Sequence, residues 1–503
     1  MKRFNKIILM CIILTVLPAG FIFSCNADQS DTNNAQNNES ALNQDIQDNP
    51  EDKTAEKVTH DVPDIEFSGY DFRVLARDGY RGMYWVTVDM FAEEVNGEPI
   101  NDAVFTRNSF LEDKFDINII EIRQDDVHGF AQRIIRAGSD DFDVLYPTMQ
   151  QSGSLVQNGL IINLYEVPYL NFDKPWWNKS INASMTIGNR LFGAAGAITT
   201  TTNDATWAVL FNKELKKTFE FDDHYQLVRE GKWTIDIMHA NSKAAARDLN
   251  GDGILDSTDQ WGAVGQHECA FSLFAASGQK IVEKDSDDMP VLALNTDRTV
   301  SVLTKVIEFM TDDSAYMNAD SSENLRKYTN VWDQVTVGVF AENRSLYLIT
   351  NFDMVKSLRN METNFGILPQ PKFNESQAQY YSTMQYNNAT VMCIPQTASD
   401  LERTGAILEV WGAESVDTLT VAYYDITLVG KYMRDDESTE MLDLIFSTRV
   451  IDLGMLFNWS GIQGFFQGFS ERGSLDFTSQ YERAEPRWVT EMERTVTAIE
   501  DNN

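Results

Sequence analysis

The sequence predicts an α/β protein with two lobes. Short apolar runs of strand length alternate with segments of helical periodicity, which favours a largely parallel sheet with helical crossovers. The chain has 503 residues, of which 43% are apolar. The segment that follows residue 63 is longer than a usual single domain, so we expect more than one lobe.

The N-terminus predicts export. Lys2, Arg3 and Lys6 precede an apolar segment, 7–23, as in a secretory signal peptide. Cys25 follows this segment in a context that resembles the bacterial lipobox, so residues 1–24 are expected to be cleaved and Cys25 to be lipidated. An ordinary signal peptide with a coincidental cysteine, or an uncleaved membrane anchor, are the alternatives. Residues 25–63 are rich in Asn, Gln, Asp, Ser and Glu, and this composition predicts a disordered tether.

The first folded elements alternate strand and helix. The run DFRVLAR (71–77) predicts a strand, the segment GEPINDAVFTRNSFLEDKF a helix, and residues 117–122 a second strand. After another helix, DFDVLYP (141–147) predicts a third strand. Ligands bind at the carboxyl ends of the strands in such sheets, so the loops that begin near Asp78 and Thr148 are the expected site.

Later elements follow the same pattern. Strands are expected at WAVLFN (207–212), SLYLITNF (345–352), NFGILPQPK (364–372) and ATVMCIP (389–395). Ser399 and Glu402 have the spacing of a capping box, which predicts a helix start. The last hundred residues are expected to be helical.

The order of these elements resembles extracellular solute-binding proteins of ABC importers, in the family 1 group that includes oligosaccharide-binding proteins. The stretches that carry the likeness are NDAVFTRNSFLEDKFDINI, DFDVLYP, TWAVLFNKEL, GKWTIDIMHANSKAAARDLNGDG, NFGILPQPK and CIPQTASDLERTGAILEVW. The resemblance covers about residues 66–490 and implies a periplasmic-binding-protein-like (type II) fold, with hinge crossings between the lobes. On this basis residues 64–200 and 373–412 would form lobe 1, and residues 201–372 and 413–503 lobe 2.

This resemblance also implies function and partners. A protein of this family captures a solute, here expected to be an oligosaccharide, and delivers it to ABC permease subunits. The chain would be a monomer, held by its lipid at the extracytoplasmic face of the cell membrane. The net charge of −35 excludes nucleic acid as a partner.

An enzyme is not expected. The five histidines form no H-E-x-x-H motif, and no phosphate-binding glycine loop follows a strand. A pair of carboxylates for glycoside hydrolysis stays open as an alternative, because 76 acidic residues offer many spacings. A calcium-dependent surface adhesion protein is a second alternative, although the chain has no internal repeats.

Residues at the expected cleft loops are candidates for ligand binding. Aromatic rings pack on the C–H faces of sugars, and carboxylates and hydroxyls bind their hydroxyl groups. The candidates are Trp85, Thr148, Asp204, Trp207, Phe352, Tyr380, Tyr381 and Trp459. Each aromatic residue has a role in the core as its alternative.

The stretch DLNGDGILDSTD (248–259) predicts a structural Ca²⁺ site. Its oxygen donors fall at loop positions 1, 3, 5, 7, 9 and 12, and are Asp248, Asn250, Asp252, the Ile254 carbonyl, Asp256 and Asp259. Gly253 allows the sharp turn at position 6, whereas Asp259 departs from the usual glutamate at position 12. The alternative is an acidic surface turn without metal. A single loop of this kind is expected to stabilise a lobe and not to act as a sensor.

Two cysteines, Cys269 and Cys393, remain once Cys11 leaves with the signal and Cys25 takes lipid. They fall in different lobes of the expected map, where a disulfide would obstruct a hinge. Both are therefore expected to be free thiols.

Overall fold

The computed structural model describes residues 58–78, 87–424 and 435–501. The predicted signal peptide, Cys25, most of the predicted tether and Trp85 lie outside these residues. Within the described ranges, no helix combines the length and the apolar character needed to cross a membrane.

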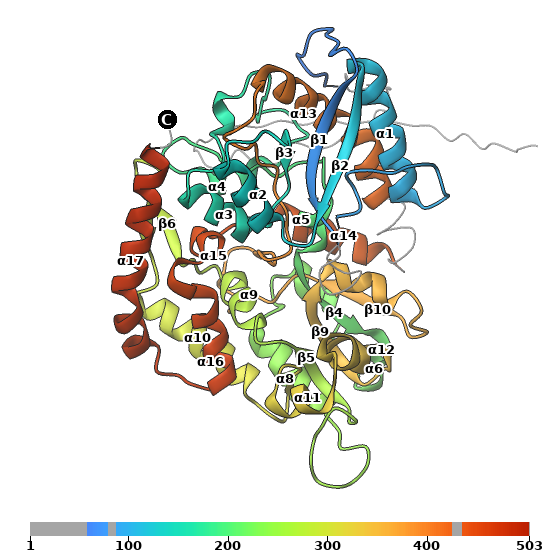
Figure 1. Ribbon diagram of the computed structural model, residues 1–503. Coiled ribbons are helices and arrows are strands. Elements are labelled where there is room, and N and C mark those ends of the chain that lie inside the picture. Colours follow the sequence, from blue (N-terminus) through green and yellow to red (C-terminus); the bar gives the residue numbers. More distant parts are fainter. Residues whose placement is uncertain (1–57, 79–86, 425–434, 502–503) are drawn as a thin grey trace, which may run out of the picture. The chain divides into compact units, whose positions relative to one another are not determined.

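A three-stranded parallel sheet forms the core of the first lobe, with the order β2-β1-β3 (Figure 1). Its strands are β1 (Tyr70–Arg77), β2 (Ile117–Gln124) and β3 (Val144–Leu145). The helices around it are α1 (Pro99–Phe115), α2 (Val127–Arg136), α3 (Met149–Gln157), α4 (Lys179–Met185) and α13 (Leu401–Ser415). Strands β1 and β2 agree with the predicted runs: residues 74–76 of β1 are buried in a row, and Ile117 and Ile119 of β2 enter the core.

The third predicted strand is shorter than expected. Only Val144 and Leu145 of DFDVLYP pair with β1, opposite Val74 and Leu75. Residues 389–395, which the sequence predicts as a strand, add single antiparallel bridges at this edge. In one of these bridges Leu145 and Cys393 exchange two backbone hydrogen bonds of 2.9 Å.

A five-stranded mixed sheet forms the second lobe, with the order β10-β4-β9-β5-β8. Its strands are β4 (Trp207–Asn212), β5 (Trp261–Gly265), β8 (Tyr316–Asn318), β9 (Ser345–Asn351) and β10 (Phe365–Leu368). Strand β4 is antiparallel to both β9 and β10, whereas β5 is parallel to β8 and β9. Every residue of β4 and β9 is buried, as their continuous apolar runs predict.

Helices cover this second sheet. They include α6 (Lys213–Thr218), α7 (His224–Arg229), α8 (Ile235–Ala245), α9 (Cys269–Ala276), α10 (Asp297–Met310), α11 (Ser322–Lys327), α12 (Gly338–Ala341) and α14 (Asp436–Ser447). A small hairpin joins β6 (Val282–Lys284) to β7 (Pro290–Leu292).

The C-terminal segment is helical, as expected. It contains α15 (Leu453–Phe457), α16 (Ile462–Arg472) and α17 (Phe477–Asp501). Both α15 and α17 contact α3 of the first lobe, and Gln157 on α3 donates a 2.9 Å hydrogen bond to Thr495 on α17.

At the junction of the lobes, three described segments lie side by side. Trp207 N donates to Thr383 O at 2.9 Å, Gln385 N donates to Ala205 O at 2.8 Å, and Val450 N donates to Ser382 O at 2.8 Å. Residues 199–207, 382–390 and 448–451 therefore form one hydrogen-bonded junction.

The predicted capping box of α13 is wrong by one residue. Asp400, not Ser399, precedes the helix, and its carboxylate accepts from Arg403 N at 3.0 Å. Both thiols are free, as predicted, and Cys269 and Cys393 are buried.

Candidate functional site

A polar cavity of about 580 Å³ lies at the carboxyl ends of the first sheet. Arg77 ends β1, Asp125 and Asp126 follow β2, and Thr148 follows β3. The three strands are parallel, so these residues meet at one edge, as the loop positions predict. Its lining residues are Arg77, Asp125, Asp126, His128, Thr148, Gln150, Gln151, Ser154, Glu268, Gln385, Asn387 and Asn388.

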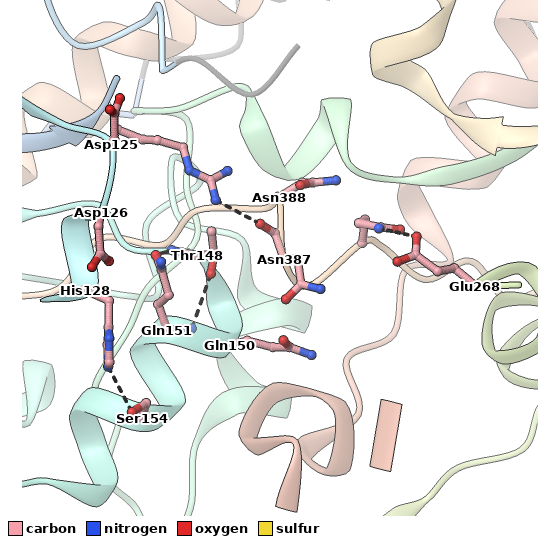
Figure 2. Close-up of a pocket in the computed structure, with 12 residues that line it drawn as sticks. Asp125, Asp126, His128, Thr148, Gln150, Gln151, Ser154, Glu268, Asn387 and Asn388 are labelled. Atoms are coloured by element: carbon pink, nitrogen blue, oxygen red, sulfur yellow. Dashed lines mark hydrogen bonds between the residues drawn. The ribbon is translucent and has the colours of Figure 1, made fainter. Parts of the chain in front are cut away.

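The cavity lining comes from both lobes and from the segment that connects them. Figure 2 shows Asp126 and His128 on one side, Glu268 on the other, and Asn387 between them. Glu268 precedes α9 of the second lobe, whereas Asn387 belongs to the connecting segment 382–390. A molecule in this cavity would therefore contact both lobes at once.

Helix α3 brings its N-terminus to the cavity. Thr148 caps it: its hydroxyl accepts from Gln151 N at 3.3 Å, and Gln151 Oε1 accepts from Thr148 N at 3.0 Å. The Gln150 amide donates a 2.8 Å hydrogen bond to Gln463 Oε1 and a 3.2 Å hydrogen bond to Met455 O. The first helical turn is thus fixed by its own cap and by the C-terminal segment.

The cavity wall carries both neutral and charged groups. His128 bonds Ser154 through Nε2 at 2.9 Å, and burial lowers the pKa of His128, which favours its neutral form. Arg77 Nη2 donates to Asn387 O at 3.3 Å. The Glu268 carboxylate accepts from Gln385 Nε2 and, at 3.3 Å, from Gln467 Nε2. Burial raises the pKa of Glu268, and the nearby charge of Asp320 acts in the same direction.

Asn388 carries a donor without an acceptor. Its Nδ2 is buried, and no described residue accepts its hydrogen bond. Buried polar groups are rarely left without a partner, because the amide loses its hydrogen bonds to water and gains none in the protein. Asn388 belongs to the cavity lining, so this amide is a candidate donor to an oxygen of a bound molecule.

Of the predicted ligand residues within the described ranges, Thr148 lines this cavity. The carboxylate of Asp204 is paired with Lys356 Nζ at 2.7 Å and accepts from the Tyr423 hydroxyl at 2.9 Å. Trp207, Phe352, Tyr380 and Trp459 are buried in the cores, and Tyr381 packs beside Gly278. Trp85 lies outside the described residues.

Sequence reasoning missed the amides that dominate the cavity. Gln150 and Gln151 lie two and three residues after Thr148, which marks the expected loop, but the search for aromatic residues did not select them. Gln385, Asn387 and Asn388 lie in QYNNAT, where no periodicity distinguishes them from any polar loop. Glu268 reaches the cavity from the other lobe, a contact that sequence spacing does not reveal.

The predicted calcium loop has a defined geometry. Asp248 accepts from Gly251 N at 2.6 Å and Gly253 N at 2.8 Å, and these bonds lower the pKa of its carboxyl. Asp252 accepts from Ile254 N at 2.8 Å. Gly251 and Gly253 have φ of +78° and +82°, the left-handed region that favours glycine. The backbone N–H groups therefore hold the loop in shape.

Two other acids of the loop also have partners. Asp259 is fully buried and accepts from Leu249 N and Asp256 N, each at 2.9 Å. Lys327 Nζ lies 3.2 Å from Asp256. Across the described residues, no three His, Cys, Asp or Glu side chains converge as a metal-binding group. The oxygens nevertheless keep free lone pairs, since each carboxylate can accept about four bonds.

Known structures share this fold. An ABC substrate-binding protein of Listeria monocytogenes, Lmo0181, solved in complex with cycloalternan, is 13% identical, with a TM-score of 0.53 over 86% of this chain and 99% of that chain. The substrate-binding proteins with this fold have two lobes, and the present chain has two lobes as well. The chain has their periplasmic-binding-protein-like fold. The predicted fold class is therefore confirmed.

Two further structures agree. A cyclo/maltodextrin-binding protein complexed with maltotetraose is 13% identical, with a TM-score of 0.53 over 87% of this chain and 98% of its own. UgpB from Mycobacterium tuberculosis, in complex with glycerophosphocholine, is 15% identical, with a TM-score of 0.55 over 80% and 98%. No family model and no curated protein sequence matches the chain.

Proposed function

We propose that this protein is a solute-binding protein that captures an oligosaccharide outside the membrane and delivers it to the permease of an ABC importer. One observation carries the proposal: a polar cavity of about 580 Å³ is lined by both lobes and by their connecting segment. Its volume is typical of sites for small molecules. The structural neighbours named for cycloalternan and maltotetraose support a sugar as the solute.

The chemistry of the lining favours a molecule rich in hydroxyl groups. Amides both donate and accept, and carboxylates accept, so each hydroxyl can be bound in both of its roles. The cavity also holds one guanidinium, that of Arg77, and the carboxylates of Asp125, Asp126 and Glu268. A neutral polar solute suits this balance better than an apolar peptide.

Solute binding is testable by titration calorimetry on the full chain. Maltotetraose, mannotriose and cycloalternan are the sugar arms, whereas glycerophosphocholine and a short peptide test other solute classes. We expect at least one sugar to bind and to return unchanged, with no new reducing ends. Release of reducing ends would favour the alternative, a lipid-anchored glycoside hydrolase. Binding of glycerophosphocholine or the peptide alone would overturn the sugar assignment.

The Asn388→Ala variant tests the cavity itself. Removal of its buried donor is expected to cost about 1 kcal/mol of solute binding, roughly fivefold in Kd. Asn118→Ala is the matched control, because Asn118 is an exposed asparagine on β2 outside the cavity lining. Equal affinities of Asn388→Ala and the unaltered chain would contradict this site.

Membrane anchoring and calcium binding complete the proposal. The lipobox-like context of Cys25 supports a lipid anchor at the extracytoplasmic face. The donor set of residues 248–259 supports structural calcium, with Asp248, Asn250, Asp252, the Ile254 carbonyl, Asp256 and Asp259 as ligands. Asp256 would exchange its contact with Lys327 for the metal. Among the described residues, no contact supports the alternative of a calcium-dependent surface adhesion protein.

A further inference from the structure

A second cavity, of about 450 Å³, borders the same junction between the lobes. It shares no lining residue with the solute cavity. Its lining includes Asn203 and Arg449 from two of the junction segments, whereas Gln385, Asn387 and Asn388 of the third segment line the solute cavity. The two cavities are therefore separate sites on one hydrogen-bonded junction.

The second cavity contains a buried cation without a counter-ion. Arg449 is 8% exposed, so its guanidinium is almost entirely removed from water. Nη1 donates to Asn203 Oδ1 at 2.6 Å, and Nε donates to Phe446 O at 3.1 Å. Both acceptors are neutral, and no carboxylate among the described residues forms an ion pair with Arg449. Burial lowers its pKa to about 10, so the group stays charged at neutral pH.

The carboxylate that Tyr423 binds has partners other than Arg449. Tyr423, which lines the cavity, donates its hydroxyl hydrogen to Asp204 at 2.9 Å. Asp204 is paired with Lys356 Nζ at 2.7 Å. Asp353 Oδ1 lies 3.0 Å from the same Nζ, so two carboxylates share one ammonium, and among the described residues neither forms an ion pair with Arg449. Burial of an unpaired charge is costly, which favours an anion from outside the chain.

The rest of the wall suits a ring. Trp177, Tyr423 and Phe446 contribute aromatic surface, and Phe446 is only partly buried. The Arg449 guanidinium lies 4.9 Å from the centroid of the Phe446 ring. A guanidinium has more N–H donors than its two contacts use, and its fork geometry matches a carboxylate.

We propose that this cavity is a second ligand site, which binds a carboxylate carried on a sugar or aromatic ring, with Arg449 as the carboxylate partner. The carboxylate accepts from the free N–H groups of Arg449, and the ring packs on Phe446. This site does not depend on the identity of the solute in the first cavity.

The test compares acids with their neutral counterparts. D-glucuronate and benzoate are titrated into the full chain beside D-glucose and benzamide, with binding followed by saturation-transfer NMR. We expect one or both acids to bind and the neutral molecules not to bind. Absence of binding by both acids, or equal binding of the neutral molecules, would overturn the proposal.

Variants assign the binding to this cavity. Arg449→Met is expected to abolish it, and Arg449→Lys to weaken it about tenfold, because an ammonium cannot form the two parallel bonds of the fork. Thr420→Trp provides an independent test, since Thr420 is exposed and lines the cavity, so a large ring there blocks it without loss of a buried contact.

The matched controls are Val421→Trp and Asn388→Ala. Val421 is 40% exposed and lies next to Thr420 but outside the lining, so its variant should bind as the unaltered chain does. Asn388→Ala should also bind normally, because it alters the solute cavity alone. Acid binding that is lost in Asn388→Ala and kept in Thr420→Trp would place the acids in the solute cavity and overturn the second site.

Discussion

At the scale of single residues, Asp452 makes folding sensitive to pH. Its carboxylate accepts from Ile281 N at 2.6 Å and Gly454 N at 2.8 Å, and so joins α15 to the chain before β6. Burial nevertheless raises its pKa to about 6. The folded state therefore keeps a proton that the unfolded state releases near pH 4, and the stability from this group is lost as pH rises between these values.

The Asp452→Asn variant isolates this effect. The free energy of unfolding of the unaltered chain, minus that of the variant, is expected to fall by on the order of 2–3 kcal/mol between pH 4 and pH 7. Urea unfolding at both pH values measures it. Asp173→Asn, at a side chain that is 96% exposed, is the control and should give a flat difference. A flat difference for Asp452→Asn as well would show that burial does not perturb this carboxyl.

Thr148 shows what residue-level reasoning can and cannot reach. It follows a predicted strand, and in the structure it lines the solute cavity. Its hydroxyl, however, accepts from Gln151 N as the cap of α3, so the side chain positions the helix that carries Gln150 and Gln151. The sequence shows that Thr148 follows a strand. It does not show that a backbone N–H group, and not a ligand, binds its hydroxyl.

At the scale of elements, the strands that are buried on both faces were the most predictable part. The predicted runs of β4 and β9 match the structure within one residue, because strands buried on both faces are continuously apolar. The start of α13 was displaced from Ser399 to Asp400, since both residues can cap and only the local backbone decides between them. The buried tryptophans 207 and 459 could not be separated from ligand contacts, because apolar packing and sugar stacking select the same side chains.

The predicted calcium loop, residues 248–259, can also be tested at the scale of elements. If calcium binds there, tenfold excess over Kd adds about 1.4 kcal/mol of stability. The melting temperature of the full chain should therefore fall on chelation while solute affinity stays the same. Loss of solute binding by a chelated but folded chain would assign the metal to the solute site instead.

Asp252→Asn should remove this response to calcium. The variant keeps an oxygen that can accept from Ile254 N but loses the negative charge that holds a hard cation. Asp313→Asn, an exposed acid outside the loop, is the control and should respond as the unaltered chain does. An identical calcium response in Asp252→Asn would show that this loop is not the metal site.

At the scale of the whole molecule, the anchor proposal has a direct test. Cys25→Ser removes the thiol that lipid would modify, so the variant is expected in the soluble fraction and the unaltered chain in the membrane fraction. Fractionation followed by detection of the chain measures the distribution. Ser24→Ala, beside the cysteine, is the control and should leave the chain in the membrane fraction. Membrane retention of Cys25→Ser would favour the uncleaved anchor.

The bridge between Leu145 and Cys393 also constrains the order in which the chain can fold. All five strands of the second sheet lie between these two residues in the sequence. That sheet can form as soon as its own strands are available, whereas the edge of the first sheet must wait for residues 389–395. Once the inserted lobe has folded, it brings the two ends of this long loop together and lowers the entropy cost of closing it. The first sheet therefore stays without this edge contact until all five strands of the second sheet have left the ribosome.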